Sequence, residues 1–351
     1  MKALVLSGGA SKGAFTAGVV EHLLRVEHMT FDFAVGTSTG SLVGGPALLN
    51  DYNYLSNIYT TVANDDILDN SFLGSILDSP IGAKMDPLHR LLRKYYIDQH
   101  RLEQLTQSGK TLVITIVNVR TGKIHMVSTR SVAAGKIAPT TFVKAILASC
   151  SEPVFTEPVR VYEDEVNSPF RHDLFYDGGV KEFLPLQEAV VEKADEIWAV
   201  STHRLEHSET PWGGGTAPDK VSIIKALLWT IGSTLDEVAR GDRYHAQVYL
   251  RCRQAVTAVN KLAADGSVSA AAKSQLLDAV QHISDDCAPP SAIYMIYPDI
   301  SMHTSLEFNE TVMMGYLRAG QRAAAAFIAK NKPMYADDTL KPWDHQEPAQ
   351  T

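Results

Sequence analysis

The chain has 351 residues, of which 45% are hydrophobic and 21% are charged, and its net charge at pH 7 is -8. This length and apolar content are enough for a large buried core, in one elaborated domain or two small ones. The acidic balance, without a long basic stripe, argues against nucleic-acid binding. Three scattered cysteines argue against a disulfide framework and fit a reducing compartment.

The first predicted elements are a buried strand over residues 1–6 and a helix, joined by a glycine-rich turn with the sequence SGGASKG. The helix is indicated by apolar residues that recur at helical spacing from Phe15 to Leu24. Glycine-rich backbone at a helix start can direct several N–H groups toward one anion. The turn matches neither nucleotide-binding pattern, because Lys12 precedes Gly13 rather than Ser or Thr, and the glycines lack the dinucleotide spacing.

A second strand is predicted over residues 31–35, and it enters the turn Gly36-Thr37-Ser38-Thr39-Gly40. The pattern Gly-x-Ser-x-Gly between a strand and a helix holds a serine on a sharp turn with its hydroxyl exposed. A side chain at either glycine would crowd this junction, and the helix that follows Ser38 favours a developing anion at its N-terminus. The same pattern also occurs in plain small-residue turns, and a nucleophile further needs a base and an oxyanion hole.

The candidate base lies downstream, in the tripeptide Asp177-Gly178-Gly179. Residues 174–176 predict a short apolar strand, and Asp177 stands at its end, where the two glycines allow a sharp bend. Taken alone, the tripeptide is typical of an ordinary turn.

Strands and helices alternate along the remaining chain. Beyond those named above, strands are predicted over residues 110–119, 124–129, 196–201 and 292–297, and helices over 139–150, 221–263 and 310–330. The first two of these strands form a hairpin. The alternation predicts an α/β fold, a three-layer α/β/α sandwich around a mainly parallel central sheet. Both glycine-rich turns then lie at the carboxyl ends of strands, where open α/β sheets bind ligands.

We expect a single catalytic domain over residues 1–331, followed by a loosely ordered tail over 332–351 that contains Pro333, Pro342 and Pro348. Within the domain, the predicted parts are a catalytic core over 1–203, a helical elaboration over 220–285, and a closing strand and helix over 291–330.

The three motifs together, in this order and at this separation, resemble the patatin-like phospholipase family. The resemblance also includes residues 31–33, 145–155, 183–186 and 196–200, and it is clear over about residues 1–203. It implies the patatin-like fold and a serine–aspartate dyad without histidine, with Ser38 as nucleophile and Asp177 as base. It also implies an oxyanion hole and a set of supporting motif positions. The oxyanion hole falls on Gly8, Gly9 and Ala10, and the supporting positions are Ser11, Lys12, Gly13, Gly36, Gly40, Gly178 and Gly179.

The chain departs from the family at two positions of the first turn. Ala10 stands where the family usually has a third glycine, and Lys12 stands where it commonly has an arginine. If position 10 needs a positive φ, alanine strains the turn. Lysine keeps the positive charge and loses the planar guanidinium fork.

By resemblance, the function is that of a lipid acyl hydrolase of the phospholipase A or lysophospholipase type, a serine carboxylic-ester hydrolase. Its expected substrates are phospholipids, lysophospholipids or other acyl esters, and neither a cofactor nor a metal is implied. No signal-peptide core or membrane span is predicted. We therefore expect a cytoplasmic protein that makes transient contact with a membrane surface.

Three alternatives stay open. A Ser-His-Asp esterase would use His172 or His203 as its base, although the α/β-hydrolase fold normally places several strands before its nucleophile, and here one strand precedes the strand leading into Ser38. A catalytically silent module would bind lipid or acyl groups without turnover. A phosphate-binding protein would use the first turn and Lys12.

Overall fold

The computed structural model describes residues 1–61, 84–204, 223–264, 268–275, 277–278, 290–300, 302 and 308–330. Within these ranges the centre of the protein is a seven-stranded sheet with the order β4-β3-β2-β1-β6-β7, and β5 also pairs with β3. The strands are β1 (Lys2–Leu6), β2 (Phe33–Gly36), β3 (Thr111–Asn118), β4 (Ile124–Ser128), β5 (Phe175–Asp177), β6 (Glu196–Val200) and β7 (Ala292–Ile296). The predicted hairpin is confirmed as β3 and β4, and the predicted mainly parallel sheet is confirmed by the parallel pairing of β1, β2, β3, β6 and β7.

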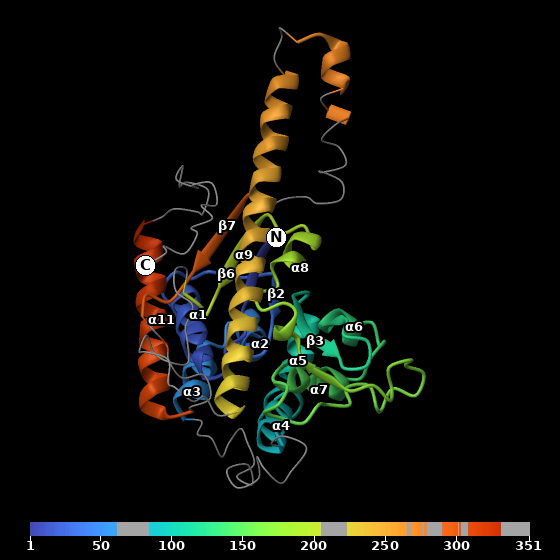
Figure 1. Cartoon of the computed structure of the whole chain (residues 1–351), viewed down its shortest axis with the longest axis vertical. Helices are drawn as coiled ribbons and strands as arrows, with labels where there is room; N and C mark the ends of the chain where they lie inside the picture. The colour runs from blue at the N-terminus through green and yellow to red at the C-terminus, as the bar shows by residue number, and fades with distance from the viewer. Residues whose placement is uncertain are drawn as a thin grey trace.

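Helices cover both faces of this sheet (Figure 1). They are α1 (Gly13–Arg25), α2 (Thr39–Leu48), α3 (Tyr52–Thr61), α4 (Asp86–Arg93), α5 (Arg101–Gln107), α6 (Thr129–Ala133), α7 (Pro139–Ser149), α8 (Leu186–Val191), α9 (Ile223–Ala264) and α11 (Glu310–Lys330), with single-turn helices η1 (Ala10–Lys12), η4 (Lys94–Asp98) and η5 (Gly178–Val180).

Alternation of side chains along the strands separates two cores. Leu4 and Leu6 of β1 belong to a cluster with buried residues of α1, α2, α3, α7 and α11. Ala3 and Val5 belong to a second cluster with residues of α8 and with Ala246 of α9. Because successive strand residues point to opposite faces, the central strand contacts both helical layers. The predicted three-layer α/β/α architecture is confirmed.

The position of β5 brings Asp177 to the nucleophile turn. Strand β4 pairs with residues 113–117 of β3, and this range overlaps the residues that pair with β2 and those that pair with β5. Because β4 occupies one edge of β3, both β2 and β5 lie along the other edge. Along that edge β2 ends with Gly36 opposite Ile114, and the antiparallel strand β5 ends two positions further along β3, with Asp177 opposite Ile116. As the chain turns out of the sheet after Gly36, β5 therefore fills the vacated place.

Helices α1 and α11, far apart in the sequence, lie side by side on one face (Figure 1). Their backbones approach closely at two glycines: a Cβ on Gly18 would overlap the carbonyl of Leu317, and a Cβ on Gly320 would overlap the carbonyl of Phe15. The Gln321 side chain also donates a hydrogen bond to Glu21, at 2.6 Å. The C-terminal helix thus covers the helix that follows the glycine-rich turn.

The longest helix, α9, crosses the other face and continues past the sheet (Figure 1). On α9 the side chains of Ala239, Asp242 and Ala246 are buried, whereas most described side chains beyond residue 250 are exposed. Across the part of the chain that the structure describes, no helix has both the length and the apolarity needed to span a bilayer. The predicted tail over 332–351 lies outside the described residues, as does much of the predicted elaboration between 265 and 285.

Candidate active site

Ser38 occupies the sharp turn between β2 and α2. It is a non-glycine residue with φ 53° and ψ −126°, a conformation that L-residues rarely adopt. The turn is closed by the Gly40 amide, which donates to the Thr37 carbonyl at 2.8 Å. A Cβ on Gly40 would overlap the Leu6 carbonyl, and one on Gly36 would overlap the backbone of Gly40. The expected crowding at both glycines is thus confirmed.

The carboxyl of Asp177 is 6% exposed and lies close enough to the Ser38 hydroxyl to interact with it. Burial raises the pKa of Asp177 to about 7, although the hydrogen bond from the Gly179 amide and the interaction with the Ser38 hydroxyl oppose this shift. The Gly179 amide donates to Asp177 Oδ1 at 2.7 Å and fixes that side chain at the start of η5. A proton acceptor with a pKa near neutrality therefore lies beside the serine hydroxyl.

Buried threonines tie the serine turn to the strand and loop that carry Asp177. Thr37 Oγ1 lies 2.7 Å from Thr115 Oγ1 on β3, and it donates to the Glu182 carbonyl at 3.1 Å. Gly178 packs so closely on Thr115 that a Cβ there would overlap the threonine hydroxyl. On the other side, the Ser38 amide donates to Ser149 Oγ at 2.9 Å. Sequence reasoning missed Thr37, Thr115 and Ser149 as positioning residues.

The glycine-rich turn has two residues in the positive-φ region, Gly9 at 144° and Ala10 at 48°. The amide of Gly8 donates to the Phe183 carbonyl at 3.1 Å, so it is not available to a substrate oxygen. The amides of Gly9 and Ala10 have no acceptor among the described residues. Thr202, at the end of β6, donates to the Gly8 carbonyl at 2.6 Å and fixes the turn. Of the three amides expected to form the oxyanion hole, those of Gly9 and Ala10 are therefore the two available to a substrate oxygen.

The remaining motif positions surround this turn. Ser11 and Lys12 are buried within η1, and Gly13 begins α1 at a point where a Cβ would overlap the Thr39 side chain. Lys12 is 6% exposed and is therefore not presented to solvent as a phosphate ligand would be. These positions pack the turn against the start of α2.

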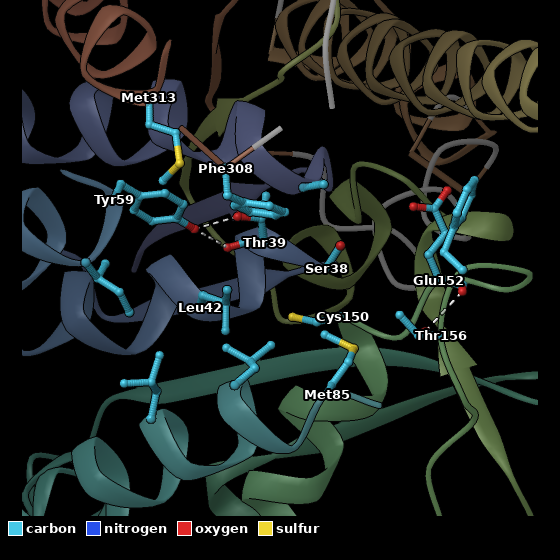
Figure 2. A pocket seen from close by; sticks show the side chains of 15 residues that line it. Ser38, Thr39, Leu42, Tyr59, Met85, Cys150, Glu152, Thr156, Phe308 and Met313 are labelled. Atoms are coloured by element: carbon cyan, nitrogen blue, oxygen red, sulfur yellow. Dashed lines mark hydrogen bonds between the residues drawn. The ribbon is translucent and has the colours of Figure 1, made fainter. Parts of the chain in front are cut away.

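An apolar pocket opens at Ser38 (Figure 2). Its walls come from α2, α3, α4, the segment after α7 and the start of α11. The lining residues are Ala10, Ser38, Thr39, Leu42, Ile58, Tyr59, Met85, Leu88, Leu91, Cys150, Glu152, Phe155, Thr156, Phe308 and Met313. Tyr59 is held in the wall by its hydroxyl, which lies 2.5 Å from Thr39 Oγ1. A pocket of this composition suits an aliphatic chain whose polar end reaches Ser38.

The comparison with protein families decides which of the expected classes applies. The sequence model of the patatin-like phospholipases matches residues 4–190, more than half of the chain. The chain belongs to this family. Patatin-like phospholipases are lipid acyl hydrolases, and the resemblance read from the three motifs is therefore confirmed.

Individual relatives share little sequence identity with this chain. The uncharacterised protein YjjU of Escherichia coli (strain K12) is 25% identical over 226 residues, which are 60% of this chain and 54% of YjjU. The chain thus spans about half the length of that curated relative. Among solved structures, VipD from Legionella pneumophila aligns with a TM-score of 0.45 and 13% identity, over 94% of this chain and 67% of VipD.

In this patatin-like chain the two histidines considered as alternative bases have different surroundings. His172 is exposed, and its carbonyl accepts from Arg160 at 3.1 Å. His203 follows β6 and contacts the ring of Phe183 edge to face, with centroids 4.4 Å apart. Neither is among the described residues that line the pocket.

Proposed function

We propose that this chain hydrolyses fatty-acyl esters of phospholipids or lysophospholipids through a Ser38–Asp177 dyad and an acyl-enzyme. The observation that carries the proposal is the placement of the Ser38 hydroxyl beside a buried carboxyl with a raised pKa, at the mouth of an apolar pocket. Family membership supports the chemistry in general, since patatin-like phospholipases act on lipid esters.

In the first half-reaction Asp177 accepts the hydroxyl proton while Ser38 Oγ bonds to the ester carbonyl carbon. The carbonyl oxygen becomes an oxyanion, which accepts hydrogen bonds from the amides of Gly9 and Ala10. The intermediate then breaks its bond to the alcohol oxygen, and Asp177 returns the proton to the departing alcohol. In the second half-reaction water replaces the alcohol, and the same steps release the fatty acid and restore Ser38.

The test is release of fatty acid from phospholipid and lysophospholipid vesicles by wild type, Ser38→Ala and Asp177→Asn, with a chelator present. We expect both variants to lose at least about a thousandfold in kcat/KM, while Ser131→Ala, which changes a serine outside the pocket, retains activity. Ionisation of Asp177 should make the wild-type kcat/KM increase with pH up to about 7 and then level off.

The alternatives predict different results in the same assay. A histidine-dependent esterase would lose activity in His172→Ala or His203→Ala, which the dyad tolerates. A silent lipid-binding module would release no fatty acid, and its Ser38 would fail to react with a fluorophosphonate probe. A phosphate-binding protein would bind inorganic phosphate, and Lys12→Ala would abolish that binding.

A further inference from the structure

The dyad does not use a second carboxyl that lines the same pocket. Glu152 lies just after α7, in a turn where the amides of Phe155 and Thr156 donate to its carbonyl at 3.2 and 3.1 Å. Val154, which lies between Glu152 and Phe155 in this turn, adopts φ 78°, a strained value for a β-branched residue. Strain of this kind persists where the surrounding structure holds a side chain in a required place. Here the turn presents Glu152, together with Phe155 and Thr156, to the pocket.

The carboxyl of Glu152 has no hydrogen-bond or ion-pair partner in the part of the chain that the structure describes. Burial, followed by the negative charge of Asp177, raises the pKa of Glu152 to about 7. A poorly solvated carboxylate without a counter-charge is costly, and a cation beside it offsets that cost. Among the described residues Glu152 therefore lacks a neighbouring positive charge, and a cationic ligand in the pocket can supply one.

The pocket around Ser38 has two chemically different sides. In Figure 2, Leu42 and Tyr59 lie to one side of Ser38, and Glu152 and Thr156 lie to the other. An ester with its carbonyl at Ser38 and its aliphatic chain toward Leu42 directs its alcohol portion toward Glu152. The ring of Phe155, three residues beyond Glu152, lines the same pocket. Aromatic faces together with a carboxylate are the groups that bind ammonium ions.

We propose that Glu152 is a specificity-determining residue, which binds the ammonium group of a zwitterionic headgroup and so favours choline or ethanolamine lipids over anionic ones. The inference rests on the proposed function, because it places the ester at Ser38. It concerns substrate choice, and the chemistry at the dyad is unaffected by it.

The test compares two lysophospholipids with the same acyl chain below their micelle concentrations, one with a choline and one with a glycerol headgroup, at pH 8. For the full-length wild type we expect kcat/KM to favour the choline lipid at least about tenfold, through KM. In Glu152→Gln the ratio should fall to within about threefold, and Glu152→Asp should retain the direction of the preference. Glu157→Gln removes the same charge from the same segment outside the pocket, and it should keep the wild-type ratio.

An unchanged ratio in a folded Glu152→Gln protein, or a wild-type preference for the glycerol lipid, would overturn the inference while leaving the hydrolase intact. If the wild type cleaves neither lipid, the proposed function fails, and headgroup binding is then measured separately. For that purpose Ser38→Ala is titrated with non-hydrolysable ether analogues of both lipids. Tighter binding of the choline analogue that disappears in the Ser38→Ala, Glu152→Gln double variant supports the inference, and equal binding refutes it.

Discussion

A carboxylate in water is too weak a base to assist a serine hydroxyl efficiently at neutral pH, and the environment of Asp177 changes this. Burial at the end of β5 disfavours the ionised form and brings its pKa to about 7, although the Gly179 amide and the Ser38 hydroxyl oppose the shift. The same burial excludes water that would compete for the serine proton. In the dyad that we propose, burial therefore gives the aspartate a pKa near neutrality, which a histidine side chain has without any shift.

The raised pKa of Asp177 has a cost in stability that can be measured. A carboxyl whose pKa is higher in the folded than in the unfolded protein stabilises the fold below its unfolded pKa. That contribution is lost as pH rises from about 4 to about 7, by roughly 4 kcal/mol at most. We expect Asp177→Asn to be more stable than wild type at pH 8, by about 1–4 kcal/mol, and the difference to shrink at pH 5.

Urea unfolding at the two pH values measures this difference. Ser38→Ala is the matched control, since it keeps the carboxyl and removes a hydroxyl that opposes the raised pKa, so its stability should fall with rising pH at least as steeply as that of wild type. A less stable Asp177→Asn protein at pH 8 would contradict the expected sign.

Ala10 carries backbone strain in the turn that supplies the proposed oxyanion hole. Its φ of 48° costs an alanine about 1–2 kcal/mol, and glycine avoids that cost while losing up to about 1 kcal/mol through the unfolded chain. We therefore expect Ala10→Gly to raise the midpoint of thermal unfolding slightly, with kcat no lower than wild type. Ala10→Val, β-branched at the same φ, should lower both. A tenfold loss of kcat in Ala10→Gly would show that the alanine methyl itself is needed in the pocket wall.

At this scale the sequence allows the sharp turn at Ser38 and the crowded glycines to be predicted, because their motifs encode local geometry, whereas the expectation for Asp177 rests on the family resemblance. The partners across the site could not be predicted in this way. Thr37 and Thr115 are ordinary β-branched residues, and nothing in their own segments indicates that their hydroxyls meet. Thr202 does carry a signal, since it follows a parallel strand and lies at the same edge as Ser38.

At the scale of elements, the contact between α1 and α11 depends on glycine at the crossing. Gly320→Ala should destabilise the protein by about 1–3 kcal/mol, because its methyl group would overlap the Phe15 carbonyl. Gly315 lies on the same helix, and apart from the surrounding helix backbone no atom of the described residues lies within 4 Å of the place that a methyl group would take there. Gly315→Ala should therefore stabilise by about 0.5–1 kcal/mol through helix propensity. Chemical unfolding of both variants measures the contrast, and equal effects would contradict a close helix crossing.

The elements themselves were largely predictable, whereas their arrangement was predictable only in part. Apolar periodicity indicates β1, α1, β3 and α7, and the alternation of strands and helices indicates the layers. The place of β5 was not predictable, because three residues carry no register signal. Its antiparallel pairing beyond the end of β2, which delivers Asp177 to Ser38, depends on contacts that form only in the folded sheet.

At the scale of the whole molecule, we propose that one catalytic domain ends near residue 331. A chain that stops after Lys330 retains α11 and every described residue of the pocket, so it should keep wild-type activity and thermal stability. A chain that stops after Asn309 loses α11, exposes the apolar surface of α1, and should be recovered mainly as aggregate. Fatty-acid release and size-exclusion chromatography distinguish the two, and a soluble, active protein without α11 would refute this boundary.

The pairing of α1 with α11 also sets an order of events during synthesis. Gly18 leaves the ribosome 302 residues before Gly320 (320 − 18), a delay of roughly 15–60 s at ordinary translation rates. Throughout that interval the apolar face of α1, directly after the glycine-rich turn, lacks its cover. A chaperone that binds nascent chains would have its longest-lived target there, and crosslinking from α1 should be lost once α11 has emerged.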